Sequence, residues 1–387
     1  MIESRVETYK GELVAIRHDL HMHPELLFEE HRTSAIVAKE LARFGYKVTT
    51  GVAGTGVIGT MTSGTGSRSV GIRADMDALP IEEMTNLPYS SRNTGKMHAC
   101  GHDGHTTMLL GAARYLAETR NFSGTVHLIF QPAEEDVSGA KRMIEEGLFK
   151  RFPCDAVFAL HNIPGEDAGQ VIVRAGAITA AADIVDVIIR GVGGHGAIPH
   201  KALDPIVAAS SIVLALQTTV SRNLDPHDPA VVTVGAFNSG NMPTVIPQEA
   251  HLQIGVRTCT KPVREMMEKR IPELISAQAK SFGCTAEIVY GHGHRYPPGF
   301  NSEAEAALVR DVAVELGQDS SRIEMQGPFM FAEDFAYMQE VVPSCYFGLG
   351  NGQTPMLHDA AYDFNDVLLT KGPVFWGRLV ERFLVKA

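Results

Sequence analysis

The chain has 387 residues, of which 44% are hydrophobic and 20% charged, and its net charge is −11 at pH 7. This length exceeds what a single hydrophobic core supports, so the sequence predicts a globular protein of two domains. The acidic balance and the absence of a Lys/Arg run argue against binding to nucleic acids or to anionic membranes.

The first 20 residues lack the apolar core of a signal peptide. Their apolar residues recur at steps of three and four, which predicts one amphipathic helix: Ile2, Val6, Tyr9, Leu13, Ile16 and Leu20. No apolar stretch approaches the ~20 residues that a membrane span needs. Five cysteines in a chain this long form no disulfide framework. We therefore expect a cytoplasmic protein.

Strand and helix patterns alternate through the first half of the chain. Strand-like runs occupy residues 70–73, 125–130 and 155–160, and a helical pattern follows the second run. This alternation predicts an α/β fold with a parallel or mixed sheet covered by helices. Functional groups gather at the carboxyl ends of strands in such sheets. Side chains able to bind a metal follow or end these runs: Asp75, Glu134, Glu135 and His161.

The stretch at residues 180–290 has a different order of elements. We expect strands at 183–190, 230–236, 250–257 and 285–290, one helix starting at Asp204-Pro205 and another over 263–282. Asp204 is a good N-cap, and Pro205 suits the first helical position. The order βαββαβ is the ferredoxin-like unit. We therefore expect residues 180–290 to form a domain inserted into a larger domain made of residues 1–179 and 291–387.

Residues 98–105 read His-Ala-Cys-Gly-His-Asp-Gly-His and bring five metal-binding or metal-orienting groups together. Thiolate and imidazole suit Zn, and imidazole also suits Mn, Co or Ni, so the cluster predicts a divalent metal without naming it. Two other interpretations remain. The histidines could cap neighbouring helices, or Cys100 could be a nucleophile with His102 as its base.

Three further positions extend this cluster. The adjacent Glu134 and Glu135 follow a strand, so one could bind a cation while the other acts as a base. His161 ends an apolar strand, and His358 lies in Met-Leu-His-Asp. Each of these is commonly structural when it stands alone. Together with the cluster, they supply enough ligands for two ions.

The ordered motifs resemble the dinuclear metallo-amidohydrolase and metallopeptidase family that contains hippurate hydrolase, aminoacylases and the plant auxin-conjugate hydrolases. The resemblance spans nearly the whole chain. Its motifs are His21–Glu25, Arg73–Pro80, His98–His105, Gln131–Glu135, Gly194–His200, Glu333–Phe335 and His358. It implies two divalent ions (Mn, Zn, Co or Ni) bound by Cys100, His102, Glu135, His161 and His358. It also implies that Glu134 is the general base.

The same resemblance implies that the inserted domain is a lid and dimerisation domain, in a homodimer or a higher homo-oligomer. His195 in its Gly-rich loop would stabilise the oxyanion, often from the partner subunit. Arg257 falls where the family places an Arg near the substrate. Thr244 stands where Asn is usual, so we predict that both Arg257 and Thr244 bind substrate.

The predicted reaction is metal-assisted hydrolysis of the amide bond of an N-acyl amino acid or a similar small amide. The chain departs from the family's usual sequence at Thr244, Phe331-Ala332 and Asp359-Ala360, which belong to the substrate side. All of the implied metal ligands are present. Two hypotheses of other classes stay open. One is a Cys100-dependent thiol hydrolase, and the other is a metal-free protein that binds small molecules.

Overall fold

The computed structural model describes residues 2–135, 138–291, 293 and 295–386. The chain forms two units. Unit 1 contains Met1–Ile178, Phe300–Gly327 and Asp334–Ala387, and unit 2 contains Thr179–Gly299 and Pro328–Glu333. Short strands β7 (Gly176–Thr179) and β14 (Gly299–Asn301) lie where the chain passes from one unit to the other.

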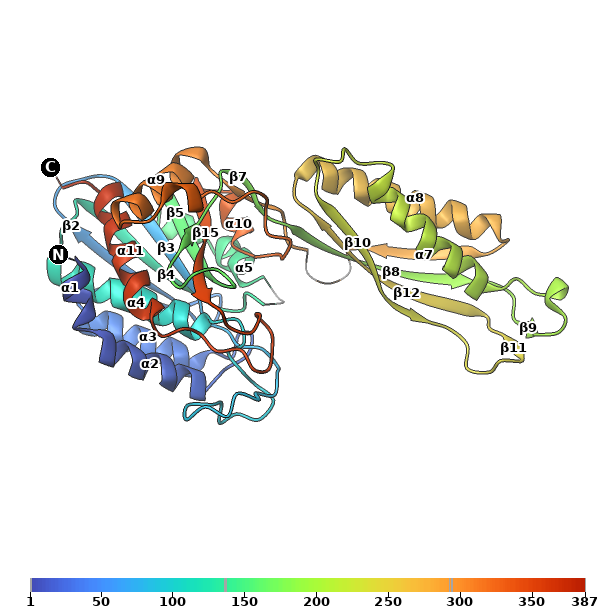
Figure 1. Cartoon of the computed structure of the whole chain (residues 1–387), viewed down its shortest axis with the longest axis horizontal. Helices are drawn as coiled ribbons and strands as arrows, with labels where there is room; N and C mark the ends of the chain where they lie inside the picture. Colours follow the sequence, from blue (N-terminus) through green and yellow to red (C-terminus); the bar gives the residue numbers. More distant parts are fainter. Residues whose placement is uncertain (1, 136–137, 292, 294, 387) are drawn as a thin grey trace. The chain divides into compact units, whose positions relative to one another are not determined.

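Unit 1 is built on a seven-stranded sheet (Figure 1). Neighbouring strands β4, β3, β5 and β15 run parallel, and β1, β2 and β6 make antiparallel pairs at the edges. The strand order is β1 (Lys47–Val52), β2 (Gly56–Ser63), β4 (Gly124–Gln131), β3 (Ser69–Asp75), β5 (Ala156–Pro164), β15 (Ser344–Gly352) and β6 (Val171–Ile172). This confirms the predicted mixed sheet. Its central strands are buried almost throughout, which explains their continuous apolar runs.

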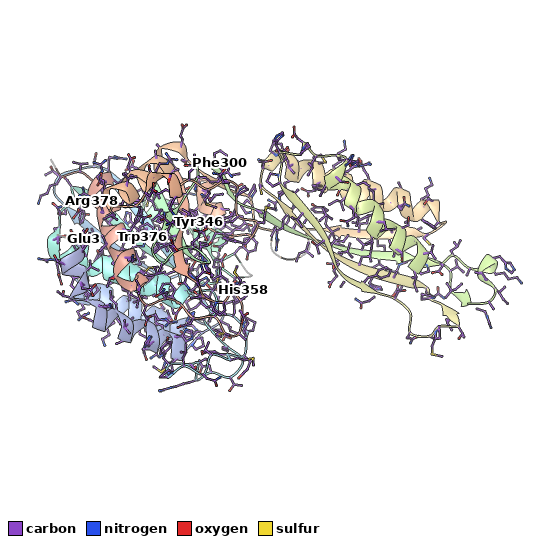
Figure 2. The ribbon with its side chains drawn as sticks, in the orientation of Figure 1. Glu3, Phe300, Tyr346, His358, Trp376 and Arg378 are labelled. Carbon is purple, nitrogen blue, oxygen red and sulfur yellow. The ribbon has the colours of Figure 1, made fainter. Side chains whose placement is uncertain are left out.

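Helices flank this sheet. The long helix α4 (His102–Thr119) contacts α2 (Lys10–Met22), α3 (His31–Arg43) and α11 (Leu368–Phe383). Trp376 of α11 is buried, with its ring 5.4 Å from that of Phe347 (Figure 2). The other helical elements of unit 1 are α1 (Ile2–Glu7), α5 (Gly139–Glu145), α6 (Leu148–Arg151), α9 (Glu303–Glu315), α10 (Ala336–Gln339) and the 3-10 turn η2 (Ser320–Arg322).

The N-terminal segment is two helices, whereas the apolar periodicity predicted one. Helix α1 ends at Glu7 and α2 starts at Lys10. Between them, the Thr8 hydroxyl donates to the carbonyl of Arg5 at 2.6 Å, and the Tyr9 amide donates to the carbonyl of Val6. A Thr side chain that binds its own backbone competes with helix continuation. The apolar residues on both sides of the break still face the core, so the periodicity persists.

Unit 2 has the predicted βαββαβ order. Its antiparallel sheet is arranged as β10 (Ala230–Asn238), β12 (Glu249–Thr258), β8 (Ala181–Arg190) and β13 (Thr285–Tyr290). Helices α7 (Pro205–Ser221) and α8 (Lys261–Ser281) pack against each other and enclose the core with this sheet. The Asp204 carboxylate accepts the Ile206 and Val207 amides, as an N-cap does. Unit 2 also contains η1 (Pro199–Lys201), β9 (Gly194–His195) and β11 (Val245–Ile246).

Across the described ranges, no helix combines the length and the apolar character that a membrane crossing requires.

Candidate metal centre

Cys100 and His102 flank the start of α4. Between them, Gly101 adopts a φ of +93°, and a Cβ at this position would lie 2.4 Å from Asn162 Oδ1. Only glycine fits a left-handed residue in so little space. The turn therefore lets two side chains, two residues apart, reach the same buried region beside the carboxyl ends of β3 and β5.

The five predicted metal ligands of unit 1 lie close together. Their side-chain atoms form two overlapping groups of three, Cys100–His102–His161 and Cys100–Glu135–His358, each within 4.8 Å. Cys100 Sγ lies 3.3 Å from His161 Nε2, and Glu135 Oε2 lies 3.3 Å from His358 Nε2. His102 Nε2 is 3.9 Å from Glu135 Oε1. One thiolate, one carboxylate and three imidazoles therefore converge on a common space.

Backbone carbonyls orient two of these imidazoles. His102 Nδ1 lies 2.9 Å from the carbonyl oxygen of Asp77, and His161 Nδ1 lies 2.8 Å from that of Asn162. A carbonyl only accepts, so each Nδ1 is the donor and each Nε2 faces the other predicted ligands. Metal-binding histidines are commonly fixed in this way.

Two buried atoms of the cluster fit a bound cation. His102 Nε2 and Glu135 Oε1 are shielded from solvent and have no hydrogen-bond partner among the described residues. Leaving a buried polar atom unsatisfied is costly, so such atoms call for an explanation. A divalent ion ligated by this imidazole and carboxylate would satisfy both atoms.

The electrostatics of the cluster also favour a cation. Burial disfavours the charged imidazole of His102, but Asp75, Asp77 and Glu135 outweigh it and raise its pKa to about 10. Burial, together with the carboxylates of Glu135, Glu134 and Asp75, raises the pKa of the Cys100 thiol well above its usual value. Nucleophilic cysteines need surroundings that lower this pKa. Among the described residues, the surroundings of Cys100 are therefore those of a neutral thiol, and a bound cation would offset the carboxylates that raise its pKa.

Behind the predicted ligands lies a layer of side chains whose mutual hydrogen bonds the sequence did not predict. Asp75 Oδ1 accepts from His105 Nδ1 at 2.6 Å, and His105 Nε2 lies 2.7 Å from Asn162 Oδ1. Arg73 donates to Asp75 at 2.7 Å. Asp75 and His105 stood in motifs that the sequence singled out, whereas nothing in the sequence marked Asn162. These contacts fix the positions of the strand ends that carry the ligands.

Glu134, the predicted base, is buried beside the ligand cluster. One of its oxygens lies within 4.8 Å of ligand atoms on both His102 and Glu135, and its Oε1 accepts from the Asp334 amide at 3.4 Å. The preceding residue, Ala133, has a φ of +52°. This left-handed turn lets Glu134 and Glu135 leave the end of β4 in directions that both reach the cluster.

His358 reaches the cluster from a strained loop. Its φ is +66°, which is uncommon for a residue other than glycine, and its amide donates to the carbonyl of Ala99 at 2.8 Å. Figure 2 labels His358. Its side chain is about half exposed, whereas those of Cys100, His102 and His161 are buried. Backbone strain of this kind persists where the surrounding structure enforces it, often at functional sites.

In unit 2, His195 and Thr244 lie next to each other. Strands β9 and β11 pair so that His195 faces Val245, and the Gly196 amide donates to the Thr244 carbonyl at 2.8 Å. The His195 ring is exposed, and its Nδ1 accepts from the Ala197 amide at 3.1 Å. Its Nε2 therefore carries the proton and can donate to a substrate oxygen.

Arg257 is not near these two residues within unit 2. Arg257 lies on β12 and pairs with Ala182, at the end of the sheet where the chain enters the unit. Glu249, at the other end of β12, pairs with Arg190, and this end leads to β9 and β11. Residues 249 and 257 are eight positions apart, about 26 Å at roughly 3.3 Å per residue. Within one unit 2, the three predicted substrate residues therefore occupy two opposite ends.

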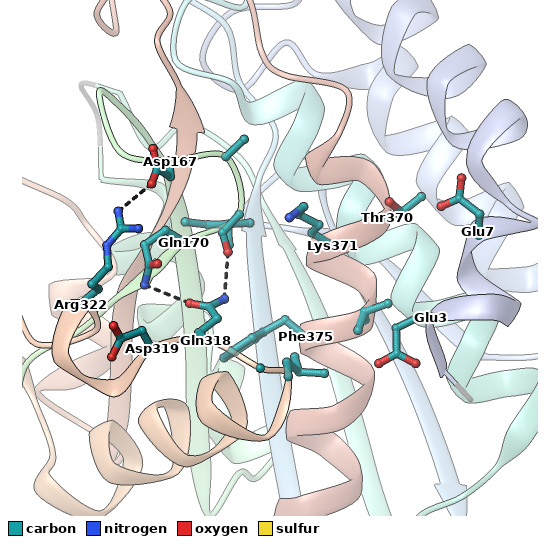
Figure 3. Close-up of a pocket in the computed structure, with 16 residues that line it drawn as sticks. Glu3, Glu7, Asp167, Gln170, Gln318, Asp319, Arg322, Thr370, Lys371 and Phe375 are labelled. Atoms are coloured by element: carbon teal, nitrogen blue, oxygen red, sulfur yellow. Dashed lines mark hydrogen bonds and ion pairs between the residues drawn. The ribbon is translucent and has the colours of Figure 1, made fainter.

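A cavity of about 570 Å³ lies elsewhere in unit 1. It is lined by residues of α1 and α11, residues 167–170 and 316–319, Arg322 and Leu349. Figure 3 shows Gln318 bonded to Gln170 and Arg322 paired with Asp167 in this lining. None of its lining residues is a predicted ligand. The predicted metal centre is therefore not part of this cavity.

Comparison with known proteins gives consistent matches. The chain matches the model of Peptidase family M20/M25/M40 over residues 71–382. It is 41% identical to the hippurate hydrolase of Campylobacter jejuni over 375 residues, which is 97% of each chain. It is 37% identical over 380 residues to an N-acetyl-L-cysteine deacetylase of Bacillus subtilis, with 98% of this chain and 90% of that relative covered.

A solved structure matches as well. A dinuclear metal binding peptidase from the M20 family of Bacillus subtilis superposes with a TM-score of 0.84 at 31% identity. The match covers 98% of this chain and 99% of the other. Sequence and fold thus lead to the same family that the motifs resemble.

Proposed function

This chain belongs to peptidase family M20/M25/M40, a family of hydrolases, and from that premise we propose that it cleaves the amide bond of N-acyl amino acids or similar small amides with two divalent cations. The names of both relatives support this substrate class, because hippurate and N-acetyl-L-cysteine are amino acids acylated on nitrogen. Their acyl groups differ, so the shared feature is the type of bond.

The observation that carries the metal dependence is a pair of buried atoms, His102 Nε2 and Glu135 Oε1, which have no hydrogen-bond partner in the described part of the chain. We assign Cys100, His102, Glu135, His161 and His358 as the ligands. Mn, Zn, Co or Ni would each suit this mixture of thiolate, imidazole and carboxylate. A bound divalent cation supplies a Lewis acid for the amide carbonyl and lowers the pKa of water from 15.7 toward ~7.

In the proposed mechanism the protein's own groups move the proton and stabilise charge. Glu134 accepts a proton from the attacking water and later delivers it to the nitrogen of the leaving amine. His195 donates from Nε2 to the oxyanion that forms at the carbonyl, a contact worth roughly 3–4 kcal/mol in other hydrolases. Asp77 and Asn162 hold the His102 and His161 rings in place through their carbonyls.

We further propose that the enzyme is a homodimer, or a higher oligomer, in which His195 acts in the active site of another subunit. A small N-acyl amino acid is much shorter than the ~26 Å between the two ends of β12. One substrate cannot contact both Arg257 and His195 of the same unit 2. If both residues bind it, they come from different copies of the chain.

We also propose that the enzyme works in the cytoplasm. Cys100, Cys154, Cys284 and Cys345 carry free thiols, and free thiols are usual where disulfides are kept reduced.

Metal removal tests the proposed function. A chelator should abolish hydrolysis of N-acyl amino acids, and Mn, Co, Ni or Zn should restore it. Cys100→Ala should lower the metal content measured by elemental analysis, because it removes the only thiolate from the ligand set. Cys345→Ala is the matched control, since Cys345 is also buried but lies outside the cluster. It should keep its metal.

The same experiment discriminates between the hypotheses. A Cys100→Ala variant with full metal content and full rate would contradict the ligand assignment. Loss of activity on thiol alkylation, with both ions still bound, would support the thiol hydrolase. Unchanged affinity for the amide after complete loss of metal, with no turnover at any stage, would support a binding protein.

A further inference from the structure

Three buried carboxylates bind the backbone of the segment that carries both glutamates of the proposed centre. Glu30 Oε1 accepts from the Ala133 amide at 2.9 Å, and Asp77 Oδ2 accepts from the Glu135 amide at 3.0 Å. Asp334 Oδ2 accepts from the Ala140 amide at 2.8 Å. The carbonyl of Asp77 also contacts His102, and the amide of Asp334 also contacts Glu134. Glu30 differs from them, because its hydrogen bonds among the described residues go to Phe28, Thr55 and Ala133, none of which is a predicted ligand or the predicted base.

Glu30 is completely buried and fully engaged in hydrogen bonds. Besides the Ala133 amide, its Oε1 accepts from the Phe28 amide at 3.0 Å. Its Oε2 accepts from the Thr55 hydroxyl at 2.5 Å. These contacts join the start of α3, the turn between β1 and β2, and the end of β4 at one carboxylate.

The residue that Glu30 holds has a backbone conformation that alanine rarely adopts. Ala133, at a φ of +52°, is buried and directly precedes Glu134. L residues disfavour this left-handed region because Cβ approaches the following carbonyl. The hydrogen bond from the Ala133 amide to the Glu30 carboxyl group is strongest when that group is ionised. It can therefore hold the turn against its local preference.

We propose that Glu30 is a positioning residue, which keeps the Ala133 turn left-handed and so fixes the direction of the Glu134 side chain. This inference rests on the proposed role of Glu134 as the general base. A base works only within hydrogen-bond reach of the proton that it takes. Relaxation of the turn by 1 Å would therefore slow the chemical step while leaving the metal ligands bound.

The surroundings of Glu30 indicate which substitution preserves this role. Burial raises the pKa of Glu30 to about 7, with the nearby Asp77 carboxylate adding to the rise. Glutamine is close in shape, and its amide oxygen still accepts from both backbone amides. Its NH2 group can donate to the Thr55 hydroxyl, which is able to accept. We call the hydrogen bonds of residue 30 that hold the Ala133 turn the clamp. Glu30→Gln should consequently keep the clamp, whereas Glu30→Ala removes it.

The first experiment measures kcat, KM and metal content. Glu30→Ala should lower kcat about 10- to 100-fold, the scale expected for a displaced catalytic group, with KM and metal content unchanged. Glu30→Gln should stay within a few-fold of the parent. The matched control is Glu25→Ala, because the Glu25 carboxylate also accepts two backbone amides, those of Arg32 and Thr33. It should lower the thermal midpoint without lowering kcat.

A second-site substitution tests the mechanism of the clamp. Glycine adopts positive φ without strain, so Ala133→Gly should make the turn less dependent on Glu30. The double variant Glu30→Ala/Ala133→Gly should recover much of the kcat lost in Glu30→Ala. If Glu30→Ala does not fold, the isosteric Thr55→Val, which frees one carboxylate oxygen, should lower kcat severalfold. Unchanged kcat in Glu30→Ala or in Thr55→Val, or no recovery with Ala133→Gly, overturns the proposal.

Amide hydrogen exchange separates this inference from the proposed function. Loss of Glu30 should accelerate exchange at the Ala133 amide, and Glu25→Ala should leave that amide protected. If Glu134→Gln leaves kcat unchanged, Glu134 is not the base, yet faster exchange at Ala133 would still establish the clamp. Unchanged exchange in Glu30→Ala overturns the clamp, whatever the role of Glu134.

Discussion

Glu134 and Glu135 are adjacent in the sequence but have different surroundings. Glu135 has one oxygen 3.9 Å from His102 Nε2 and the other 3.3 Å from His358 Nε2, in the midst of the proposed ligands. Glu134 accepts from the Asp334 amide and lies at the edge of the cluster. The strained turn at Ala133 points the side chains of Glu134 and Glu135 in different directions. The two residues should therefore respond differently to substitution.

Glu134→Gln should cut kcat by ~10²–10⁴ and leave the metal content unchanged, because it removes a proton acceptor but no ligand. Glu135→Ala should instead release metal, since it removes a carboxylate that faces both His102 and His358. Steady-state kinetics and elemental analysis on the same preparations would show this. The opposite pattern at the two positions would mean that their roles are reversed.

The convergence of the ligand candidates was predictable, but their orientation was not. Cys100 and His102 lie in one short motif. Glu135 follows β4 and His161 lies in β5, the two strands that flank β3 in the parallel part of the sheet. Those patterns depend only on local sequence. The rings of His102 and His161 are oriented by carbonyls of Asp77 and Asn162. Every residue has a carbonyl, so the sequence carries no signal for these contacts.

At the scale of elements, α4 is the helix on which the centre depends. It is buried along almost its whole length, and Gly104 in its first turn lies against Phe364. A Cβ at Gly104 would be 2.3 Å from the Phe364 ring. The close approach of this ring sets the position of the helix start, from which His102 and His105 extend.

Gly104→Ala should destabilise the protein by about 1–3 kcal/mol, the usual cost of overpacking a core, and should weaken metal binding by shifting the start of α4. Gly11→Ala is the matched control in α2, because no atom lies within 4 Å of the added Cβ. It should raise stability by up to about 1 kcal/mol, as glycine is a poor helix former. Urea denaturation would measure both. A Gly104→Ala variant as stable as the parent would show that Phe364 moves aside freely.

Long elements were predictable because burial leaves a pattern in their sequence. The runs at 70–73, 125–130 and 155–160 became β3, β4 and β5, and the Asp204-Pro205 start of α7 is where the capping pattern indicated. Short elements were not predicted. Strands β9 and β11 have two residues each, too few to show a period. They form because Gly193 and Gly196 let two loops approach closely: an added Cβ would lie 2.9 Å from the Ile246 oxygen and 3.0 Å from the Thr244 oxygen, respectively. This close approach is a tertiary effect.

At the scale of the whole molecule, the positions of His195 and Arg257 lead to a test of assembly. These residues lie at opposite ends of the unit 2 sheet. Two inactive variants, Glu134→Ala and His195→Ala, can be mixed under conditions that allow subunits to exchange. If His195 acts across the dimer, each mixed dimer has one site with both residues intact, and part of the activity should return.

Labelled subunits would establish that exchange has taken place. Absence of recovery in a fully exchanged mixture would place His195 in the active site of its own chain. A parent enzyme that is active and strictly monomeric by light scattering would exclude action across a dimer altogether.

The place of β15 in the sheet bears on how the chain folds during synthesis. This strand, at Ser344–Gly352, lies between β5 and β6, whose residues precede it by more than 170 positions. Nearly all of unit 2 is one continuous stretch and can fold while the ribosome still holds the rest. Unit 1 cannot complete its sheet so early, because the edge of β5 stays unpaired until the last ninth of the chain emerges. At 5–20 residues per second, synthesis of the stretch between β5 and β15 takes roughly 10–40 s. An unpaired strand edge is where nascent chains aggregate or recruit chaperones.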